Sequence, residues 1–299
     1  MLSRIISVVS LCAFIAPAQT RGQVPTAAGA SVKLVSEGYL FTEGPAADAE
    51  GNVYFTDQPN DRILKWSCDT GKITEFMKNT GRANGLYFVP PRALVACADE
   101  TGQLRSIDLK TQEVTILVDN FEGKLFNGPN DLWVHPQGGI YFTDPFYKRD
   151  YWKNRDAPEL EKQSVYFLPM GSKTLSAVDD ALVQPNGIIG TSASRTLYVA
   201  DMGAGKTYQY TIAPDGKLTG RKLFCEMGSD GMAIDTSGNV YLTGKGVTVF
   251  DHTGKKLGEI PIPEDWTANV TFGGKDHKTL FITAMDSLYS LEMTVAGAR

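Results

Sequence analysis

Six polar residues recur at one position of a repeating pattern, and their side chains could together bind a hard metal ion. Each lies 14 or 15 residues before the end of a repeated apolar segment; the six are Glu43, Asn84, Asn130, Asn186, Asp230 and Asn269. All six offer carboxylate or amide oxygens, and none is His or Cys. Oxygen ligands of this kind suit Ca²⁺ first and Mg²⁺ or Mn²⁺ second. The pattern therefore predicts one divalent cation, most readily Ca²⁺, with Mg²⁺, Mn²⁺ and Zn²⁺ as alternatives.

The repeated segments themselves predict the fold. The copies NVYFTD, ALVACAD, GIYFTD, TLYVAD, NVYLTG and TLFITA end at residues 57, 99, 144, 201, 244 and 284. Successive copies are 42, 45, 57, 43 and 40 residues apart, and periods near 40–45 residues with several short strands are typical of propeller blades. The first period holds four strand-like runs: 45–48, GNVYFTD, RILKWS and KITEFM. We expect an all-β chain, a six-bladed β-propeller with four-stranded blades, whose inner strands bring the six polar residues to one end of the axis.

The two ends of the chain fit a closed ring. The last period ends near Met293 and is one strand short, whereas the strand-like residues 32–39 have no blade of their own. An N-terminal strand that completes the last blade would leave no open sheet edge. We therefore expect a signal peptide at 1–18, a linker at 19–31 and the propeller domain at 32–299.

The first residues have the pattern of a secretory signal. Arg4 precedes an apolar run at 5–16, and Ala16-Pro17-Ala18 has the small-x-small form of a cleavage site. The run is shorter than the roughly 20 residues that span a bilayer, although an uncleaved anchor is the alternative interpretation. The pattern predicts an exported protein, periplasmic or secreted, without a stable membrane anchor.

One period is longer than the rest, and its excess lies at residues 145–163. This stretch is polar, charged and aromatic, so we expect an inserted loop with room for a short helix. Tyr147 and Lys148 open the loop, and Arg82 precedes Asn84 by two residues. Each could line a substrate mouth or could simply pack or face solvent.

Composition excludes several classes of function. The net charge is −5 and no basic cluster is present, which argues against nucleic acid as a partner. The sequence has no G-x-S-x-G elbow, no G-x-G-x-x-G after a strand and no P-loop. Cys68, Cys97 and Cys225 show no C-x-x-C spacing, and we expect buried thiols rather than a disulfide framework. A small-molecule substrate is the remaining expectation, and the oligomeric state is left open.

Four motifs resemble one known family. They are EGP at 43–45, GKLFNGPNDLWVHPQGGIYFTDPFY at 123–147, QPNGI at 184–188 and DGMAID at 230–235. With them the chain resembles, from about residue 35 to about residue 293, the senescence marker protein/gluconolactonase/luciferin-regenerating enzyme-like family, which includes squid-type diisopropyl fluorophosphatase. The resemblance implies a calcium-dependent six-bladed hydrolase whose metal ligands are Glu43, Asn130, Asn186 and Asp230.

The same resemblance suggests further roles and shows two departures. It implies that Asp230 is the general base or nucleophile, and that Asn84 and Asn269 are further polar positions on the axis that contact substrate. Many bacterial members have Arg where this chain has Leu125, and vertebrate members have a substrate-contacting Arg where it has Gly128. These departures question a preference for sugar-acid lactones but not metal binding.

Three functional hypotheses follow. The first is a gluconolactonase-like enzyme, in which the metal polarises the lactone carbonyl and Asp230 activates water or attacks directly. The second is a phosphotriesterase-like hydrolase that uses the same site, and the third is a non-catalytic ligand-binding propeller with structural Ca²⁺.

Two expectations concern the other aspartates. Asp57, Asp99, Asp144 and Asp201 end repeated strands, and we expect them to bind strand-end backbone rather than do chemistry. Asp131 follows a predicted ligand, and we expect it to point away because side chains alternate along an extended segment.

Overall fold

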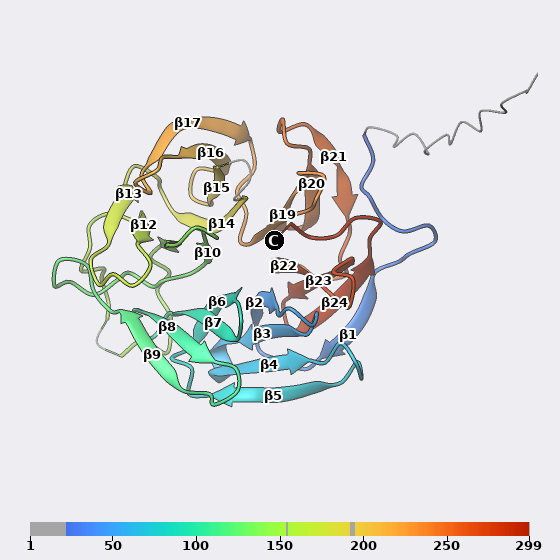
Figure 1. Cartoon of the computed structure of the whole chain (residues 1–299), viewed down its shortest axis with the longest axis horizontal. Helices are drawn as coiled ribbons and strands as arrows, with labels where there is room; N and C mark the ends of the chain where they lie inside the picture. The colour runs from blue at the N-terminus through green and yellow to red at the C-terminus, as the bar shows by residue number, and fades with distance from the viewer. Residues whose placement is uncertain (1–21, 154, 192–194, 299) are drawn as a thin grey trace, which may run out of the picture.

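A ring of six antiparallel sheets around one axis makes up the molecule (Figure 1). The computed structural model describes residues 22–153, 155–191 and 195–298. In this part of the chain 24 strands form six four-stranded sheets, each wound outward from an inner strand to an outer one. The sequence-based prediction of an all-β, six-bladed propeller with four-stranded blades is confirmed.

The blades follow one another in chain order. Blade one consists of β2 (Thr42–Ala47), β3 (Val53–Asp57), β4 (Arg62–Trp66) and β5 (Ile73–Lys78), and blade two of β6 (Ala83–Val89), β7 (Ala93–Ala98), β8 (Gln103–Asp108) and β9 (Val114–Val118). Blade three consists of β10 (Leu132–Val134), β11 (Ile140–Asp144), β12 (Ser164–Leu168) and β13 (Ser176–Asp179), and blade four of β14 (Pro185–Thr191), β15 (Thr196–Asp201), β16 (Lys206–Ile212) and β17 (Leu218–Cys225). Blade five consists of β18 (Met232–Ile234), β19 (Val240–Gly244), β20 (Gly246–Phe250) and β21 (Lys256–Ile260), and blade six of β22 (Thr267–Gly273), β23 (Thr279–Ala284), β24 (Ser287–Glu292) and β1 (Lys33–Glu37).

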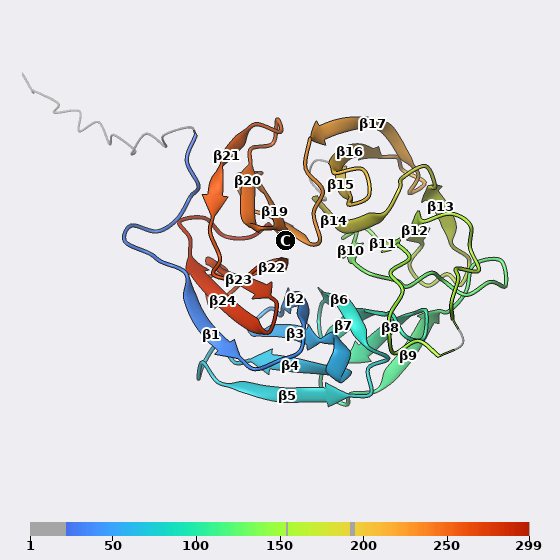
Figure 2. The same cartoon turned by 180° about the vertical axis from the view of Figure 1, so that it is seen from behind.

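The first strand closes the ring. β1 pairs antiparallel with β24, with Leu34 opposite Tyr289, and forms the outer strand of blade six (Figures 1 and 2). This confirms that the N-terminal strand completes the last blade. The residues just before β1 also lie along blade six, because the Ala27 amide donates to the Glu292 carbonyl at 3.0 Å. The predicted signal peptide at 1–18 lies outside the described residues.

The core is divided among the blade interfaces. Six clusters of buried apolar side chains lie one between each pair of neighbouring blades. Between blades two and three, for example, Phe126 meets Phe142 edge-on at 5.4 Å between ring centroids. Full burial of one such ring stabilises the fold by about 1.5–3 kcal/mol. Packing on both sides therefore fixes how each inner strand is presented to the axis.

Chain direction gives the ring two different faces. All six inner strands begin at the same end of the axis, which we call the site face, and they end at the far face. The insertion at 145–163 follows β11, so it lies on the site face. The last described residues cross the far face toward the axis, where the Ala298 amide donates to the Ile234 carbonyl at 2.8 Å (Figure 1).

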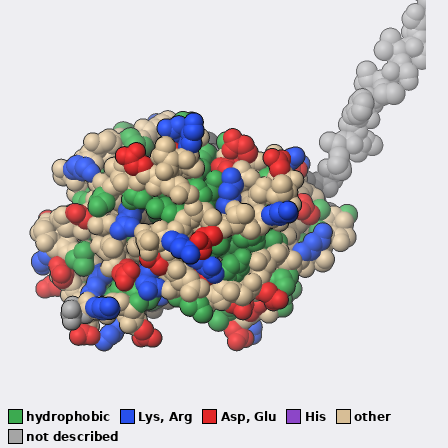
Figure 3. All heavy atoms as spheres, turned by 90° about the horizontal axis from the view of Figure 1, so that it is seen from below, with side chains coloured by type: hydrophobic (Ala, Val, Ile, Leu, Met, Phe, Trp, Pro, Cys, Tyr) green, Lys and Arg blue, Asp and Glu red, His purple; other side chains and the backbone are tan. Residues whose placement is uncertain are grey.

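The structure also bears on the insertion, the cysteines, the surface charges and possible membrane-spanning helices. Within its described residues the insertion has turns and no helix, so the room left for a helix is not used. Cys97 and Cys225 are buried and Cys68 is half-buried, and all three are free thiols. In the view of Figure 3 acidic and basic side chains are interspersed. Among the described residues no helix is long and apolar enough to cross a bilayer.

Candidate functional site

The six predicted polar residues lie around the axis at the site face. All belong to, or immediately precede, the inner strands, and Glu43, Asn84, Asn130, Asn186 and Asn269 are between 2% and 5% exposed. Asn130 and Asp230 precede β10 and β18 by two residues. We call this group the axial ring.

Close backbone contacts join the members of the axial ring. In four blades the next residue is a glycine, and a Cβ there would collide with the following blade. At Gly44 that Cβ would lie 2.0 Å from the Asn84 carbonyl oxygen, and at Gly231 it would lie 1.9 Å from the Asn269 side chain. Except at Gly44, φ at these glycines is not positive, so the Asn-Gly and Asp-Gly pairs serve close approach rather than tight turns. The small residue lets the inner strands converge.

Asp230 is held by both of its carboxylate oxygens. The Asn186 side-chain amide donates to Oδ1 at 2.8 Å, and the indole N–H of Trp266 donates to Oδ2 at 2.7 Å. These two bonds fix the plane of the carboxylate and leave a lone pair on each oxygen. Trp266 lies in the loop before β22, and the sequence analysis did not identify it.

Two buried amide oxygens in the axial ring have no partner. The Oδ1 atoms of Asn84 and Asn186 accept no hydrogen bond within the described structure. Leaving a buried acceptor unpaired costs about 1–3 kcal/mol. The Asn186 amide nitrogen is fully used, because it donates to Asp230 and to the Tyr147 hydroxyl at 3.0 Å. Because these two bonds fix the orientation of the Asn186 amide, its Oδ1 atom is left free. Only a hydrogen-bond donor or a cation could satisfy this oxygen.

The carboxylates of the axial ring are held at an electrostatic cost. Burial, together with the charge of Asp230, raises the pKa of Glu43 well above its usual range. Burial likewise raises the pKa of Asp230, although the Trp266 and Asn186 hydrogen bonds oppose the shift. Two acids buried side by side disfavour their shared ionised state. A bound cation would remove this penalty, so the donor set fits a hard divalent ion.

Asp131 forms a second layer below the ring. Its carboxylate accepts from the Leu132 backbone amide at 2.9 Å. Burial raises the pKa of Asp131 to about 7. The expectation that Asp131 points away is wrong, because Asp131 stands where four other blades have glycine and its side chain also lines the axial channel.

The predicted mouth residues have different positions. The Tyr147 hydroxyl touches Asn186, and burial together with the charge of Asp230 raises its pKa to about 12. Arg82 instead donates to the Pro59 carbonyl and stacks on the Tyr151 ring at 4.2 Å. Lys148 pairs with Asp156 in solvent at 3.1 Å. Of the three, the structure brings only Tyr147 into contact with the axial ring.

Three of the four strand-end aspartates behave as predicted. Asp57, Asp144 and Asp201 each accept from the two backbone amides that lead into the inner strand of their own blade. Asp99 differs, since it accepts from side chains: Gln58 at 3.0 Å, Arg149 Nε at 3.2 Å and the Tyr151 hydroxyl. The prediction that Asp99 binds strand-end backbone is wrong, because side chains of the blade-three insertion reach across to blade two and donate to the Asp99 carboxylate.

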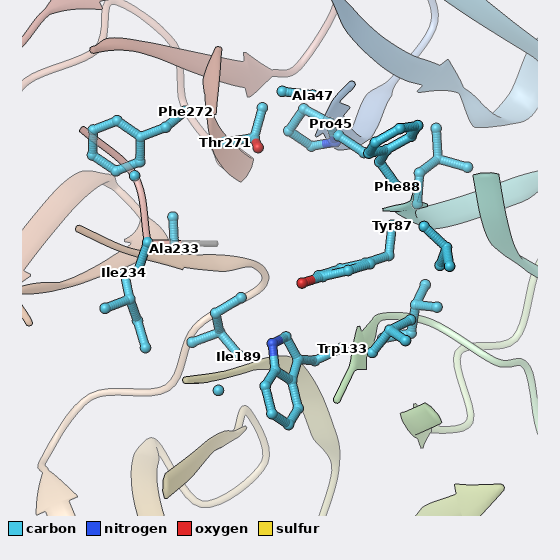
Figure 4. Close-up of a pocket in the computed structure, with 18 of the residues that line it drawn as sticks. Pro45, Ala47, Tyr87, Phe88, Trp133, Ile189, Ala233, Ile234, Thr271 and Phe272 are labelled. Carbon is cyan, nitrogen blue, oxygen red and sulfur yellow. The ribbon is translucent and has the colours of Figure 1, made fainter. Parts of the chain in front are cut away.

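A cavity opens at the other end of the axis. It has a volume of about 590 Å³ and is lined from every blade, by residues that include Pro45, Tyr87, Trp133, Ile189, Ala233 and Phe272 (Figure 4). Asp131 and Asn269 lie at its inner end. We call it the far pocket. Apart from Asn269, no predicted site residue lines it, so the far pocket is not where the unpaired oxygens of Asn84 and Asn186 lie.

Comparison with known proteins identifies the family. The family model of the SMP-30/gluconolactonase/LRE-like region matches residues 41–286. The chain belongs to this family.

Members of the SMP-30/gluconolactonase/LRE-like family resemble the chain over most of its length. Gluconolactonase of Zymomonas mobilis is 28% identical over 89% of this chain and 82% of its own. The structure of a gluconolactonase from Xanthomonas campestris is 30% identical with a TM-score of 0.82, covering 91% of this chain and 94% of that one. Regucalcin from Agrobacterium tumefaciens, a calcium-binding protein, shares the fold with a TM-score of 0.75 and 20% identity over 93% of this chain and 97% of that one.

The types of donor in the axial ring indicate which metal they could bind. Within the described residues no three His, Cys, Asp or Glu side chains come together as a metal-binding group. The predicted ligands are instead two carboxylates, Glu43 and Asp230, and two amides, Asn130 and Asn186. This mixture is typical of a calcium site, where neutral oxygens complete the shell.

Proposed function

We propose that the protein hydrolyses a small cyclic ester, a lactone of the gluconolactone type, at the axial ring. The similarity to gluconolactonases from two bacteria supports this substrate class. The observation that carries the proposal is the way Asp230 is held, a half-buried carboxylate fixed through both oxygens by Asn186 and Trp266. A carboxylate that is fixed and raised in pKa, next to unpaired oxygens, is typical of a catalytic site rather than of a core.

We propose that Glu43, Asn130, Asn186 and Asp230 hold one divalent cation, most readily Ca²⁺. The unpaired Oδ1 of Asn186 and the raised pKa values of Glu43 and Asp230 support this assignment. A relative by fold, regucalcin, binds calcium. When bound, the ion would supply Lewis acidity that polarises the lactone carbonyl and stabilises the charge developing on its oxygen.

The chain's own residues then orient and move the proton. Asn186 and Trp266 hold Asp230 so that the remaining lone pairs of its carboxylate face the axis. There Asp230 accepts a proton from the attacking water, or attacks the carbonyl carbon itself. In either case one water is consumed, the ring C–O bond breaks and the hydroxy acid leaves. Tyr147, fixed on Asn186, narrows the approach to this carboxylate.

The test measures turnover of glucono-1,5-lactone by the purified full-length chain, corrected for spontaneous hydrolysis. Activity should vanish with chelator and return when Ca²⁺, Mg²⁺ or Mn²⁺ is added. Asp230→Asn should lower kcat by about 10²–10⁴-fold. Asp286→Asn, at an exposed carboxylate, is the matched control and should leave kcat unchanged.

Other outcomes would support the alternatives. Turnover of paraoxon but of no lactone would make the protein a phosphotriesterase. If Asp230→Asn folds, binds metal and retains full turnover, Asp230 is not the catalytic group. Metal binding without turnover of either substrate class would leave a ligand-binding propeller.

We also propose that the protein is exported. The charged start, apolar run and small-x-small site in residues 1–18 support this. Mass determination of the mature N-terminus should show cleavage after Ala18, and an intact Met1 on a cell-retained chain would contradict it.

A further inference from the structure

We propose that Arg149, in the insertion, is a substrate-binding residue that recognises oxygen substituents on the lactone ring. The inference rests on the proposed lactonase function. It names the chemistry of the substrate as a lactone carrying hydroxyl or carboxylate oxygens, in contrast to an unsubstituted one.

Arg149 reaches the axial ring through two contacts. Its guanidinium carbon lies 5.3 Å from the centroid of the Tyr147 ring. The Tyr147 hydroxyl accepts from Asn186 at 3.0 Å, and the same amide group donates to Asp230 at 2.8 Å. Burial disfavours the charged guanidinium, but the carboxylates of Asp99, Glu43 and Asp230 outweigh it and raise the pKa of Arg149. The guanidinium therefore lies within the field of the ring.

Much of the hydrogen-bonding capacity of Arg149 is unused. Only Nε has an acceptor among the described residues, namely Asp99 Oδ2 at 3.2 Å. Both terminal Nη groups are without one, and 27% of the side chain is exposed. A guanidinium offers five N–H donors in a planar fork, so Asp99 anchors one edge and leaves the other available.

The neighbouring arginines are committed elsewhere. Arg82 donates to the Pro59 carbonyl, and its Nε lies 3.4 Å from Glu100. Arg155 donates to the Phe126 and Asp99 carbonyls and stacks on Trp152 at 4.0 Å. These two hold the insertion against blade two, beside which it runs in Figures 1 and 2. Arg149 is different because its free edge has no backbone carbonyl to bind.

The same packing explains why the positively charged side chain above the axial ring, Arg149, comes from the insertion. At Gly128 a Cβ would lie 2.6 Å from Asp99 Oδ1 and 3.2 Å from the Trp152 ring. No side chain fits there while the insertion is in place. The space above the ring is therefore furnished by the insertion itself, and Arg149 contributes its charge.

A free guanidinium edge matches one kind of group. Two parallel N–H donors fit a carboxylate or a pair of neighbouring hydroxyl oxygens. A site built to hydrogen-bond such oxygens discriminates strongly against a substrate that lacks them, because its donors would then be buried without partners.

The experiment compares three substrates on the Ca²⁺-loaded full chain: glucono-1,5-lactone, a carboxylated sugar lactone and δ-valerolactone. Arg149→Gln, which can still donate to Asp99, should lower kcat/KM about 10²-fold or more on the substituted lactones. It should change δ-valerolactone turnover by less than about 3-fold. A larger loss on the carboxylated lactone would identify carboxylate as the preferred group, and a larger loss on the neutral one would identify hydroxyls. Arg149→Lys keeps the charge without the fork and should rescue only the carboxylated substrate.

Two binding measurements are independent of turnover. Calorimetry should show that Arg149→Gln binds Ca²⁺ several-fold more tightly, because a positive charge near Glu43 and Asp230 is removed, whereas Arg149→Lys should not. D-gluconate should bind the Ca²⁺-loaded wild type at least about 10-fold more tightly than Arg149→Gln. Lys148→Gln, which removes an exposed positive charge from the same insertion, is the control and should alter neither value.

The outcomes separate the two proposals. If the wild type hydrolyses no lactone but binds gluconate through Arg149, the proposed function fails and the present inference stands. If Arg149→Gln lowers turnover of all three lactones equally, or changes neither Ca²⁺ nor gluconate affinity, Arg149 does not bind substrate.

Discussion

The two ends of the axial channel are built from the same six inner strands but differ in chemistry. At the site face the strands begin with carboxylates and amides, and two buried amide oxygens lack partners. A few residues further along the same strands the walls of the far pocket carry aromatic and aliphatic side chains such as Trp133 and Phe272 (Figure 4). The same six strands thus form a polar end, where buried acceptors lack partners, and an apolar end.

The contrast between the two ends indicates where an active site is expected in such a propeller. The far pocket has a volume of about 590 Å³, yet few of the residues that line it are polar. The axial ring gathers groups whose burial is unfavourable unless a ligand is present. We therefore expect the site at these unfavourably buried polar groups rather than at the far pocket. If the two ends are independent, changes in the far pocket should alter stability but not metal binding, and changes in the axial ring should alter metal binding.

The largest expected effect is on stability at the far pocket. Phe272→Ala removes a buried ring that packs edge-on against Tyr241 at 5.3 Å. The free energy of unfolding should fall by about 3–5 kcal/mol, measured by chemical denaturation of the Ca²⁺-loaded protein. Ca²⁺ affinity of the folded fraction should stay within about 3-fold of wild type. A large loss of affinity would join the two ends.

The next effect should be on metal binding at the axial ring. Glu43→Gln keeps the shape of the side chain but removes one of two ligand charges. Ca²⁺ affinity, measured by calorimetry, should fall more than about 100-fold. Tyr87→Phe, which removes a polar atom from the far pocket, is the matched variant at the other end and should leave affinity unchanged. Equal losses in both variants would contradict the separation.

A smaller effect is expected where Asp230 is oriented. Trp266→Phe keeps an aromatic ring but removes the donor to Asp230 Oδ2. The value of kcat/KM on a lactone should fall about 10–100-fold. Trp66→Phe, in the outer part of blade one, serves as the control. Unchanged kinetics would show that Asn186 alone is enough to hold the carboxylate.

The smallest effect is on the pH dependence of thermal stability. Glu43, Asp131 and Asp230 have folded-state pKa values above their unfolded ones, with Asp131 at about 7. Their protonated forms favour folding, so the metal-free protein should lose stability as pH rises from about 4 to above 7. The increase in Tm caused by Ca²⁺ should therefore be several degrees larger at pH 7.5 than at pH 5. Scanning calorimetry with and without chelator tests this. If Ca²⁺ raised Tm by the same amount at both pH values, the titration of these acids would not be coupled to Ca²⁺ binding.

The register of the repeat predicted the fold and the position of the axial ring. Six strand ends at regular spacing require six equivalent strand starts, so a local count of residues was enough to bring Glu43 and Asp230 together. The same reasoning placed β1 beside β24, because an unpaired edge is unfavourable.

The residues that the sequence analysis missed act across blades rather than within the repeat. Trp266 comes from the loop between β21 and β22, and Arg149 and Tyr151 come from an insertion that docks against Asp99. Asp131 looked like the outward neighbour of a ligand, but the inner strands converge so closely that consecutive residues both reach the channel. No period in the sequence encodes such contacts.

Pairing of β1 with β24 has a consequence for how the molecule is assembled. Leu34 faces Tyr289, so the first strand in the described part of the chain has the last one as its partner. Blade six can be completed only after the other five have been laid down, and contacts between such distant residues form slowly. Until then one blade lacks its outer strand and exposes a free edge that another chain could occupy. Shortening the chain before residue 37 would make that temporary vulnerability permanent.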